Sequence, residues 1–207
     1  MKLVVIDYES GNLRSVSRAL ESQGVTPLVI GDASEFGDAD AMILPGVGSG
    51  LSAMDALNQR NLVDPIRDYI SSGRPFLGVC LGLQLLLDRT EEGDAPCLGV
   101  VPGDTKLLPA GLKVPHMGWN SVMFKDDTAN RHPVLAGIPD DSFFYFVHSY
   151  YADPEHRDGV SATTEYGIPF CSIYASGNLI ATQFHPEKSG PVGLRFYSNF
   201  IAMARAN

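Results

Sequence analysis

One cysteine of the chain stands where the local sequence could make a thiol reactive. Cys80 lies between two glycines in the run GVCLGLQ, directly after the apolar segment PFLGV. This order predicts a strand, a sharp turn and a helix, with the cysteine at the turn. Free N–H groups at the start of that helix would favour a thiolate. A cysteine that only fills a corner of the core is the open alternative.

A thiolate nucleophile needs a base, and His185 is the most suitable of the five histidines. It closes a strand-like segment in ATQFHPE, and Glu187 follows two residues later. Alternation along an extended segment would place both side chains on one side, so that the carboxylate orients the imidazole. A surface turn after a strand would contain the same three residues, HPE.

The glycine-rich run PGVGSG at residues 45–50 ends a third apolar strand. Ligand sites of parallel sheets lie beyond the carboxyl ends of the strands, so this loop and Cys80 would share one edge. Backbone N–H groups there could face a developing negative charge. The expected donors are the N–H groups of Leu81, Gly46, Val47 and Gly48. No Walker lysine follows, which makes a phosphate-binding loop the weaker interpretation.

The first half of the chain is expected to alternate between strands and helices. Short apolar runs predict strands, and apolar residues at helical spacing between them predict helices. The strands are expected at 3–6, 27–30, 41–44 and 75–79, and the helices at 12–23, 51–71 and 81–87. Continuously apolar strands separated by helices indicate a parallel sheet that is covered on both faces.

The second half is richer in strands and turn signals. Strand-like segments are expected at 97–109, 120–124, 142–151, 160–166 and 169–184, followed by a helix over 192–205. The triplet Ser176–Asn178 predicts a hairpin turn inside the last of these segments. We therefore expect a single α/β domain over residues 1–207, with a mostly parallel central sheet, helices on both faces and an antiparallel extension.

Composition excludes several classes of protein. The chain has 207 residues and a net charge of −9, which argues against a nucleic-acid partner. Its three cysteines, Cys80, Cys97 and Cys171, do not form a disulfide framework, so a reducing cytoplasm is expected. The N-terminus MKLVVIDYES is not typical of a signal peptide, and no apolar stretch is long enough to span a membrane.

The combination of PGVG, GVCLGLQ and FHPE resembles the class I, triad-type glutamine amidotransferase family. Its glutaminase domains use a Cys-His-Glu triad, and the spacing of 185 − 80 = 105 residues between Cys80 and His185 fits them. The resemblance implies a flavodoxin-like fold. The segments DYESGNLRS, PHMGWN, FVHSYY and EKSG resemble one branch of the family, the glutaminase subunits of imidazole glycerol phosphate synthase. Tyr8–Gly11 is less rich in glycine than that branch.

The resemblance implies a role for each matched residue. Cys80 would attack the carboxamide carbon of glutamine, His185 would transfer the proton, and Glu187 would orient His185. Water would then hydrolyse a glutamyl thioester. Backbone N–H groups of Leu81 and of residues 46–48 would hold the oxyanion. The implied glutamine-binding positions are Gln84, Glu92, Ser149 and Tyr150. No cofactor and no metal are expected.

The resemblance also implies a partner. A cyclase subunit with a (β/α)8 barrel would receive the ammonia through a closed path, in a heterodimer that makes imidazole glycerol phosphate and an aminoimidazole carboxamide ribonucleotide in histidine biosynthesis. Asn12, Trp119 and Lys188 are the expected interface positions. For Trp119, a core position in a hairpin is the alternative.

Three other functions remain open. The glutaminase could serve another synthase, such as that for pyridoxal phosphate or anthranilate, although PHMGWN and GNLRS count against this. A stand-alone cysteine hydrolase or chaperone-like protein could use the same turn, but FHPE and Gln84 disfavour it. A flavodoxin-like binding module would need neither Cys80 nor His185.

Overall fold

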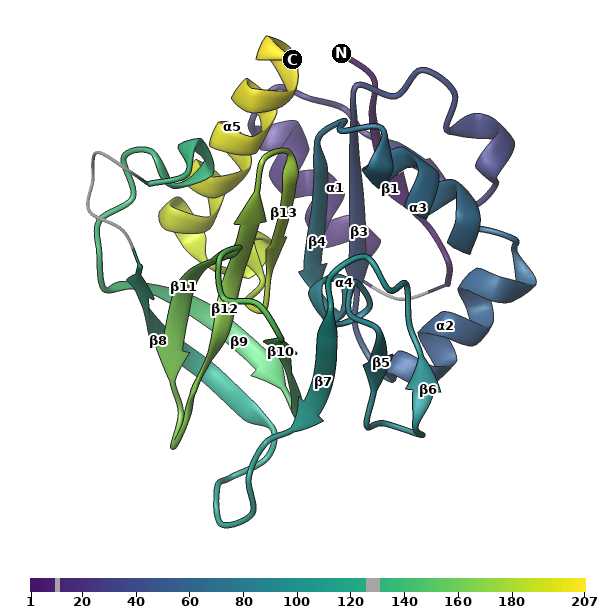
Figure 1. Cartoon of the computed structure of the whole chain (residues 1–207). Coiled ribbons are helices and arrows are strands. Elements are labelled where there is room, and N and C mark those ends of the chain that lie inside the picture. The colour runs from purple at the N-terminus through teal and green to yellow at the C-terminus, as the bar shows by residue number, and fades with distance from the viewer. Residues whose placement is uncertain (10–11, 126–130) are drawn as a thin grey trace.

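The centre of the computed structural model is a nine-stranded sheet with the order β2-β1-β3-β4-β13-β12-β11-β8-β9 (Figure 1). The structure describes residues 1–9, 12–125 and 131–207, so Ser10 and Gly11 of the segment DYESGNLRS lie outside it. The strands are β1 (Leu3–Ile6), β2 (Leu28–Ile30), β3 (Ala41–Gly46), β4 (Phe76–Cys80), β8 (His116–Phe124), β9 (Ser142–His148), β11 (Val160–Glu165), β12 (Pro169–Ser176) and β13 (Leu179–Thr182).

Five strands of this sheet run parallel. β1 pairs with β2 and β3, β3 pairs with β4, and β4 pairs with β13 from the far end of the chain. The remaining pairs, from β13 to β9, are antiparallel. The prediction of a parallel sheet with an antiparallel extension is therefore confirmed.

Helices cover both faces of the parallel part. Leu3 and Val5 of β1 pack into one core with α1 (Leu13–Ser22) and α5 (Gly190–Ala206). Their neighbours Val4 and Ile6 pack into a second core with α2 (Gly50–Gln59) and α3 (Val63–Ser71). Side chains of a strand alternate between its two faces, so a strand buried on both is apolar throughout.

Two predicted helices are shorter than expected. The stretch 51–71 is two helices, because the chain turns at Asn61, whose φ of 55° interrupts the helical backbone. The stretch 81–87 holds only α4 (Leu81–Gln84). Beyond it, the carbonyl groups of residues 85–87 accept hydrogen bonds from the N–H groups of residues 98–101 instead of continuing the helix.

A second, four-stranded sheet lies beside the first, with the order β10-β7-β5-β6. Its strands are β5 (Arg89–Thr90), β6 (Ala95–Pro96), β7 (Gly103–Leu107) and β10 (Tyr150–Pro154). The expected strand at 142–151 was wrong as one element, since it breaks at Ser149 into β9 of the large sheet and β10 of the small one. Likewise, only β7 forms within 97–109, whereas β8 begins four residues before the expected 120–124.

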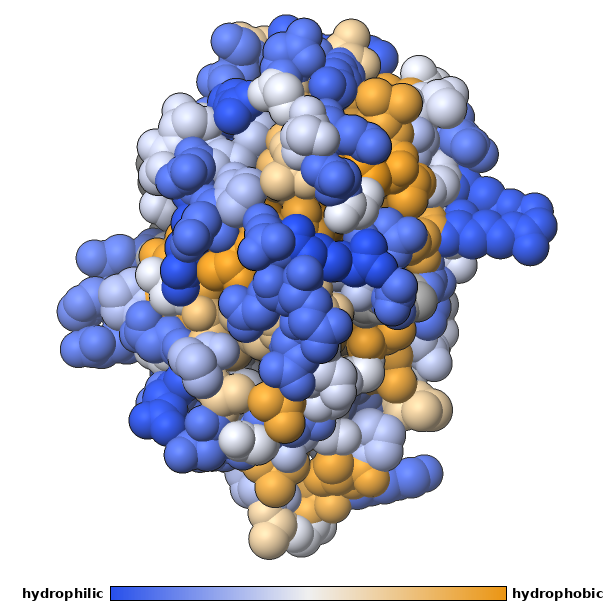
Figure 2. All heavy atoms as spheres, turned by 90° about the vertical axis from the view of Figure 1, so that its right-hand side faces the viewer, coloured by the Kyte–Doolittle hydropathy of each residue, from blue (hydrophilic) through white to orange (hydrophobic). Residues whose placement is uncertain are grey.

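The surface over α2 and α3 is mostly hydrophilic, with hydrophobic residues in smaller groups (Figure 2).

Short 3-10 turns connect some of these elements: η1 (Ala33–Glu35), η2 (Pro133–Leu135) and η3 (Pro186–Lys188). Within the described ranges, no helix has both the length and the apolar character needed to cross a membrane.

Candidate active site

Cys80 stands at a strained turn between a strand and a helix. It is the last residue of β4, and its φ of 53° and ψ of −102° are unusual for a residue with a side chain. A Cβ atom on Gly82 would lie 2.0 Å from the carbonyl oxygen of Leu44, and one on Gly78 would lie 2.8 Å from the backbone of Gly82. Both glycines therefore permit the close approach of α4 to the sheet, which gives the GVCLG pattern its physical reason.

The sulfur of Cys80 borders a pocket of about 310 Å³ at the carboxyl ends of the parallel strands. The side chain is buried, with 5% of its surface exposed. Gln183 Nε2 lies 3.7 Å from the sulfur, and the carbonyl oxygen of Val147 lies 3.9 Å from it. The pocket is lined by Val47, Gly48, Cys80, Leu81, Gln84, Glu92, Pro115, Val147, His148, Ser149 and Tyr150.

His185 and Glu187 form a buried pair. His185 Nδ1 lies 2.8 Å from Glu187 Oε1, and their side chains are 1% and 0% exposed. The expected extended segment is wrong, because Pro186 starts the 3-10 turn η3 and the N–H of Lys188 donates to the His185 carbonyl. The turn, not strand alternation, carries the carboxylate back beneath the imidazole.

The two ring nitrogens of His185 lie in different environments. Nδ1 faces the carboxylate, and Nε2 is buried without a hydrogen-bond partner among the described residues. Burial lowers the pKa of His185, but the charge and hydrogen-bonding capacity of the Cys80 sulfur, followed by the hydrogen bond and charge of Glu187, outweigh burial and raise this pKa to about 10. The arrangement therefore favours the protonated form of the His185 imidazole.

Two further residues hold Glu187, and the sequence did not single out either for this role. Asn12 Nδ2 donates to Oε1 at 2.5 Å, and the hydroxyl of Tyr197 lies 3.4 Å from Oε2. Burial, followed by the charge of Glu187, raises the pKa of Tyr197 well above its ordinary value, so its hydroxyl remains a donor. Tyr197 comes from α5, ten residues beyond Glu187, and only its helical position could have suggested this contact.

The expected oxyanion donors lie close together. Leu81, Val47 and Gly48 line the pocket, and Gly46 pairs with Cys80 across β3 and β4. Gly46 is not among the lining residues, but a Cβ atom there would lie 2.8 Å from Leu81 Cβ. The structure thus brings all four residues to the same edge of the sheet.

The four expected glutamine-binding residues also line this pocket. Gln84 Nε2 donates to the carbonyl oxygen of Tyr150 at 2.7 Å, and Glu92 Oε2 accepts from the N–H of Gly50 at 2.5 Å. Ser149 lies at the junction of β9 and β10, and Glu92 follows β5. One wall of the pocket therefore comes from the small sheet and its connections, which bring the carboxylate of Glu92 to the same pocket as Cys80.

A histidine pair that the sequence did not reveal lies next to the pocket. His148 Nδ1 lies 2.8 Å from the Tyr150 carbonyl and can only donate, so His148 Nε2 accepts from His116 Nδ1 at 2.9 Å. Burial lowers the pKa of His116 to about 4 and that of His148 to about 3. Both rings are therefore neutral near pH 7. The two histidines belong to the segments PHMGWN and FVHSYY, and no local pattern in the sequence indicates that their rings meet.

The three expected interface residues lie in different environments. Trp119 is 56% exposed on β8 and contacts Tyr145 of β9, so the alternative of a core position is wrong. Lys188 is exposed, and its Nζ lies 5.8 Å from the centre of the Tyr145 ring. Asn12 instead turns to Glu187. Exposed hydrophobic side chains on the same two strands are Met117, Met123 and Phe143.

Known proteins resemble this chain along nearly its whole length. The family model described as "Glutamine amidotransferase class-I" matches residues 4–203. Proteins named "Imidazole glycerol phosphate synthase subunit HisH" are 45% identical in Dehalococcoides mccartyi strain CBDB1, over 98% of this chain and 97% of the relative, and 47% identical in Rhodopirellula baltica, over 96% of each. The relative of the same name in Aquifex aeolicus is 46% identical, over 97% of this chain and 96% of its own.

Solved structures share the fold at low sequence identity. A structure titled "Crystal structure of glutamine amidotransferase" has a TM-score of 0.75 and 18% identity, over 98% of each chain. The structure of PurLQS from Thermotoga maritima has a TM-score of 0.74 and 17% identity, over 99% of this chain and 97% of that one. At these identities the likeness concerns the fold alone.

Proposed function

The chain belongs to the class-I glutamine amidotransferase family, and we propose that it is the glutaminase subunit of an imidazole glycerol phosphate synthase. The observation that carries this proposal is the identity of 45–47% with subunits of that name over at least 96% of the chain. The geometry supports it, because Cys80 lines a pocket large enough for an amino acid, and the buried pair of His185 and Glu187 interacts with its sulfur.

In the proposed reaction, Cys80 is the nucleophile. Its thiolate attacks the carboxamide carbon of glutamine, and the carbonyl oxygen takes up the negative charge. His185, which holds the thiol proton, gives it to the departing ammonia as the C–N bond breaks. His185, now neutral, takes a proton from the water that attacks the glutamyl thioester. The C–S bond breaks with its electron pair on sulfur, and glutamate leaves the regenerated thiolate and protonated imidazole. Glu187 fixes the Nδ1–H tautomer of His185 throughout.

Backbone N–H groups would stabilise the oxyanion. Leu81 starts α4 and lines the pocket, so its N–H group is the first proposed donor, and residues 46–48 would supply the second. Such a donor typically contributes about 10²–10³ to kcat, because it acts on charge that develops in the transition state.

The pocket wall supports recognition of an amino-acid substrate. The carboxylate of Glu92 is the acidic group among the lining residues, and we assign it to the α-ammonium group of glutamine. Gln84, Ser149 and Tyr150 complete this wall, and their polar groups are assigned to the backbone end of the substrate.

The proposed partner is a cyclase subunit with a (β/α)8 barrel, bound as a heterodimer. Free ammonia is mostly protonated in water and then is not a nucleophile, so a sealed passage between the subunits would preserve it. Trp119 is the proposed apolar contact, and Lys188 the proposed cation for a carboxylate of the barrel. Asn12 lies at the same edge through its bond to Glu187.

We further propose that residues 1–207 work as one domain in the cytoplasm. β4 of the first half pairs with β13 of the second, so the halves share one sheet. All three cysteines are free, and a nucleophilic thiol benefits from a reducing compartment.

The experiment is a measurement of glutamate release by the purified chain, alone and with the cyclase subunit and its ribonucleotide substrate. We expect slow release alone and a large rise in kcat in the complex, together with formation of imidazole glycerol phosphate from glutamine. Glutamate release that no cyclase stimulates would favour a stand-alone hydrolase. Stimulation by a different synthase subunit alone would favour another pathway.

A further inference from the structure

Gln183 is a buried polar residue that the reaction above does not use. It follows β13, two residues before His185, and none of its surface is exposed. Its side-chain nitrogen lies 3.7 Å from the sulfur of Cys80, within the range of an N–H donor to sulfur. A buried amide costs free energy unless its groups are paired, so its partners should explain its presence.

The neighbouring groups determine which end of this amide faces the sulfur. The backbone carbonyl of Tyr150 can only accept, so the nitrogen of Gln84 faces it at 2.7 Å. The same nitrogen lies 3.2 Å from Oε1 of Gln183. With its oxygen paired to Gln84, the Gln183 amide must turn its N–H group to Cys80. The orientation therefore follows from a single carbonyl group at the pocket wall.

A donor at this place has an electrostatic purpose. The carbonyl oxygen of Val147 also lies near the sulfur, at 3.9 Å, and repels negative charge there. The N–H of Gln183 offsets this repulsion, and it lies in a water-poor interior where such dipoles act strongly. His185 supplies the opposite charge, while Gln183 supplies a neutral donor whose position does not change when the proton moves.

We infer that Gln183 donates to the nucleophilic sulfur, and that the chain of contacts Tyr150–Gln84–Gln183 fixes this donor from the substrate wall of the pocket. The inference rests on the proposed glutaminase function and adds a residue to it. Negative charge is on the sulfur twice, before attack on glutamine and again when the C–S bond of the thioester breaks. Gln183 therefore assists both half-reactions and contributes to kcat more than to KM.

The test compares three variants of the full chain, each measured with the cyclase subunit. Gln183→Met keeps the volume and removes the donor. Gln183→Glu keeps the shape and can still accept from Gln84, but turns an acceptor oxygen to the sulfur. Thr182→Val is the matched control, since it removes a buried hydrogen bond of the same segment, from Thr182 Oγ1 to the Phe184 carbonyl, that does not face the thiol.

We expect kcat to fall about tenfold or more in Gln183→Met and further in Gln183→Glu, with KM changed by less than about threefold. Alkylation of Cys80 by iodoacetamide, followed by peptide mass spectrometry, should slow in the same order without any glutamine present. Thr182→Val should resemble the wild type in both assays. Normal kcat and normal alkylation in both Gln183 variants, or equal losses in Thr182→Val, would overturn the inference.

Glutamate release by the wild-type complex separates this inference from the proposed function. A wild-type complex that releases no glutamate would end the glutaminase proposal, whatever the variants do. Active wild type with unaffected Gln183 variants would leave that proposal intact and remove Gln183 from it. Melting temperatures measured alongside identify a variant that has lost its fold, in which case the other Gln183 variant decides.

Discussion

The side-chain amide of Asn12 donates to Oε1 of Glu187 at 2.5 Å, the same oxygen that lies 2.8 Å from His185 Nδ1. The two residues are 175 positions apart in the chain. Asn12 precedes α1 with a φ of 83°, and the helix contacts the η3 turn that carries Glu187. The first helix of the chain thus holds the acidic end of the proposed triad.

Asn12→Ala should lower kcat for glutamine about tenfold, with and without the cyclase subunit. A hydrogen bond to a charged group contributes about 1.5–3 kcal/mol, and its loss frees the Glu187 carboxylate to move away from His185. Steady-state kinetics of glutamate release provide the measurement. If only the cyclase-stimulated rate fell, Asn12 would act in docking and not through Glu187.

Cys80→Ala should abolish glutamine hydrolysis and leave the fold intact, because alanine fits the turn between the two glycines. The loss should be on the order of 10⁶-fold, as for other sites whose residues act as a unit. Cys97→Ala and Cys171→Ala are the controls, since neither residue lines the pocket. Burial raises the pKa of Cys97 to about 11 and that of Cys171 to about 12, so both remain thiols. Residual activity in the Cys80 variant would rule out the proposed nucleophile.

The chain should lose stability as the pH falls from 6.5 towards 4. Burial lowers the pKa of His116 to about 4 and of His148 to about 3, from 6.5. Between these pH values both histidines are protonated in the unfolded chain but not in the native state. The free energy of unfolding therefore decreases with decreasing pH. Urea unfolding at pH 7 and pH 5 measures the change.

His116→Gln tests the origin of this acid sensitivity. Its amide can still donate to His148 Nε2, but one of the two titrating rings is gone. The decrease in unfolding free energy between pH 7 and pH 5 should therefore be smaller than in the wild type. An equally steep decrease would place the cause elsewhere in the chain.

Lys188→Ala should reduce stimulation by the cyclase more than the basal rate. Lys188 has no carboxylate within 4 Å among the residues that the structure describes, so its charge is available to a partner. Leaving the partner's charge buried and unpaired costs about 2–5 kcal/mol. Glutamate release is measured over a range of cyclase concentrations.

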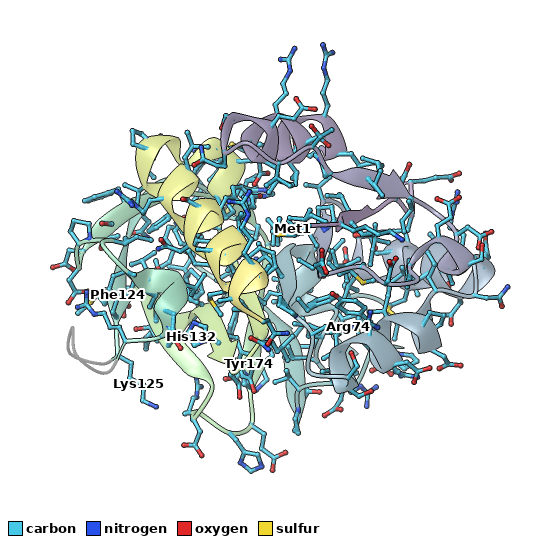
Figure 3. All side chains as sticks on the ribbon, turned by 90° about the horizontal axis from the view of Figure 1, so that it is seen from above. Met1, Arg74, Phe124, Lys125, His132 and Tyr174 are labelled. Atoms are coloured by element: carbon cyan, nitrogen blue, oxygen red, sulfur yellow. The ribbon has the colours of Figure 1, made fainter. Side chains whose placement is uncertain are left out.

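Lys125→Ala is the matched control for Lys188. Lys125 follows β8 at the end away from His116, and Figure 3 shows its side chain pointing outward. Its loss removes the same charge from a different part of the surface. Equal effects of the two substitutions would indicate a general charge effect, not docking at the η3 turn.

Trp119→Ala should weaken the complex while the free chain keeps its stability. The side chain is 56% exposed, so the free protein gains little from burying it, whereas an interface anchor contributes about 2 kcal/mol or more. Calorimetric titration with the cyclase measures the affinity. Leu28→Ala is the control, because Leu28 is 48% exposed on β2 at the opposite edge of the sheet. Unchanged affinity in the Trp119 variant would exclude β8 from the interface.

The sequence by itself predicted the strands of the parallel sheet and the sharp turn at Cys80. Apolar runs predicted the parallel strands, since a strand that is buried on both faces has apolar side chains on both. The glycines around Cys80 predicted the sharp turn, because they let α4 approach β4 and β3 more closely than side chains would permit. The split of 51–71 into two helices was not predicted, since asparagine adopts a positive φ more readily than most residues but does not require it.

The tertiary structure alone decided which distant groups meet. The η3 turn, not an extended strand, places Glu187 beneath His185, and only the packing of α1 and α5 brings Asn12 and Tyr197 to the same carboxylate. The contacts of Gln183 depend in the same way on Tyr150, from the other sheet. Periodicity reports the environment of each residue in turn, whereas these contacts arise where separate elements pack against one another, and no local pattern encodes that arrangement.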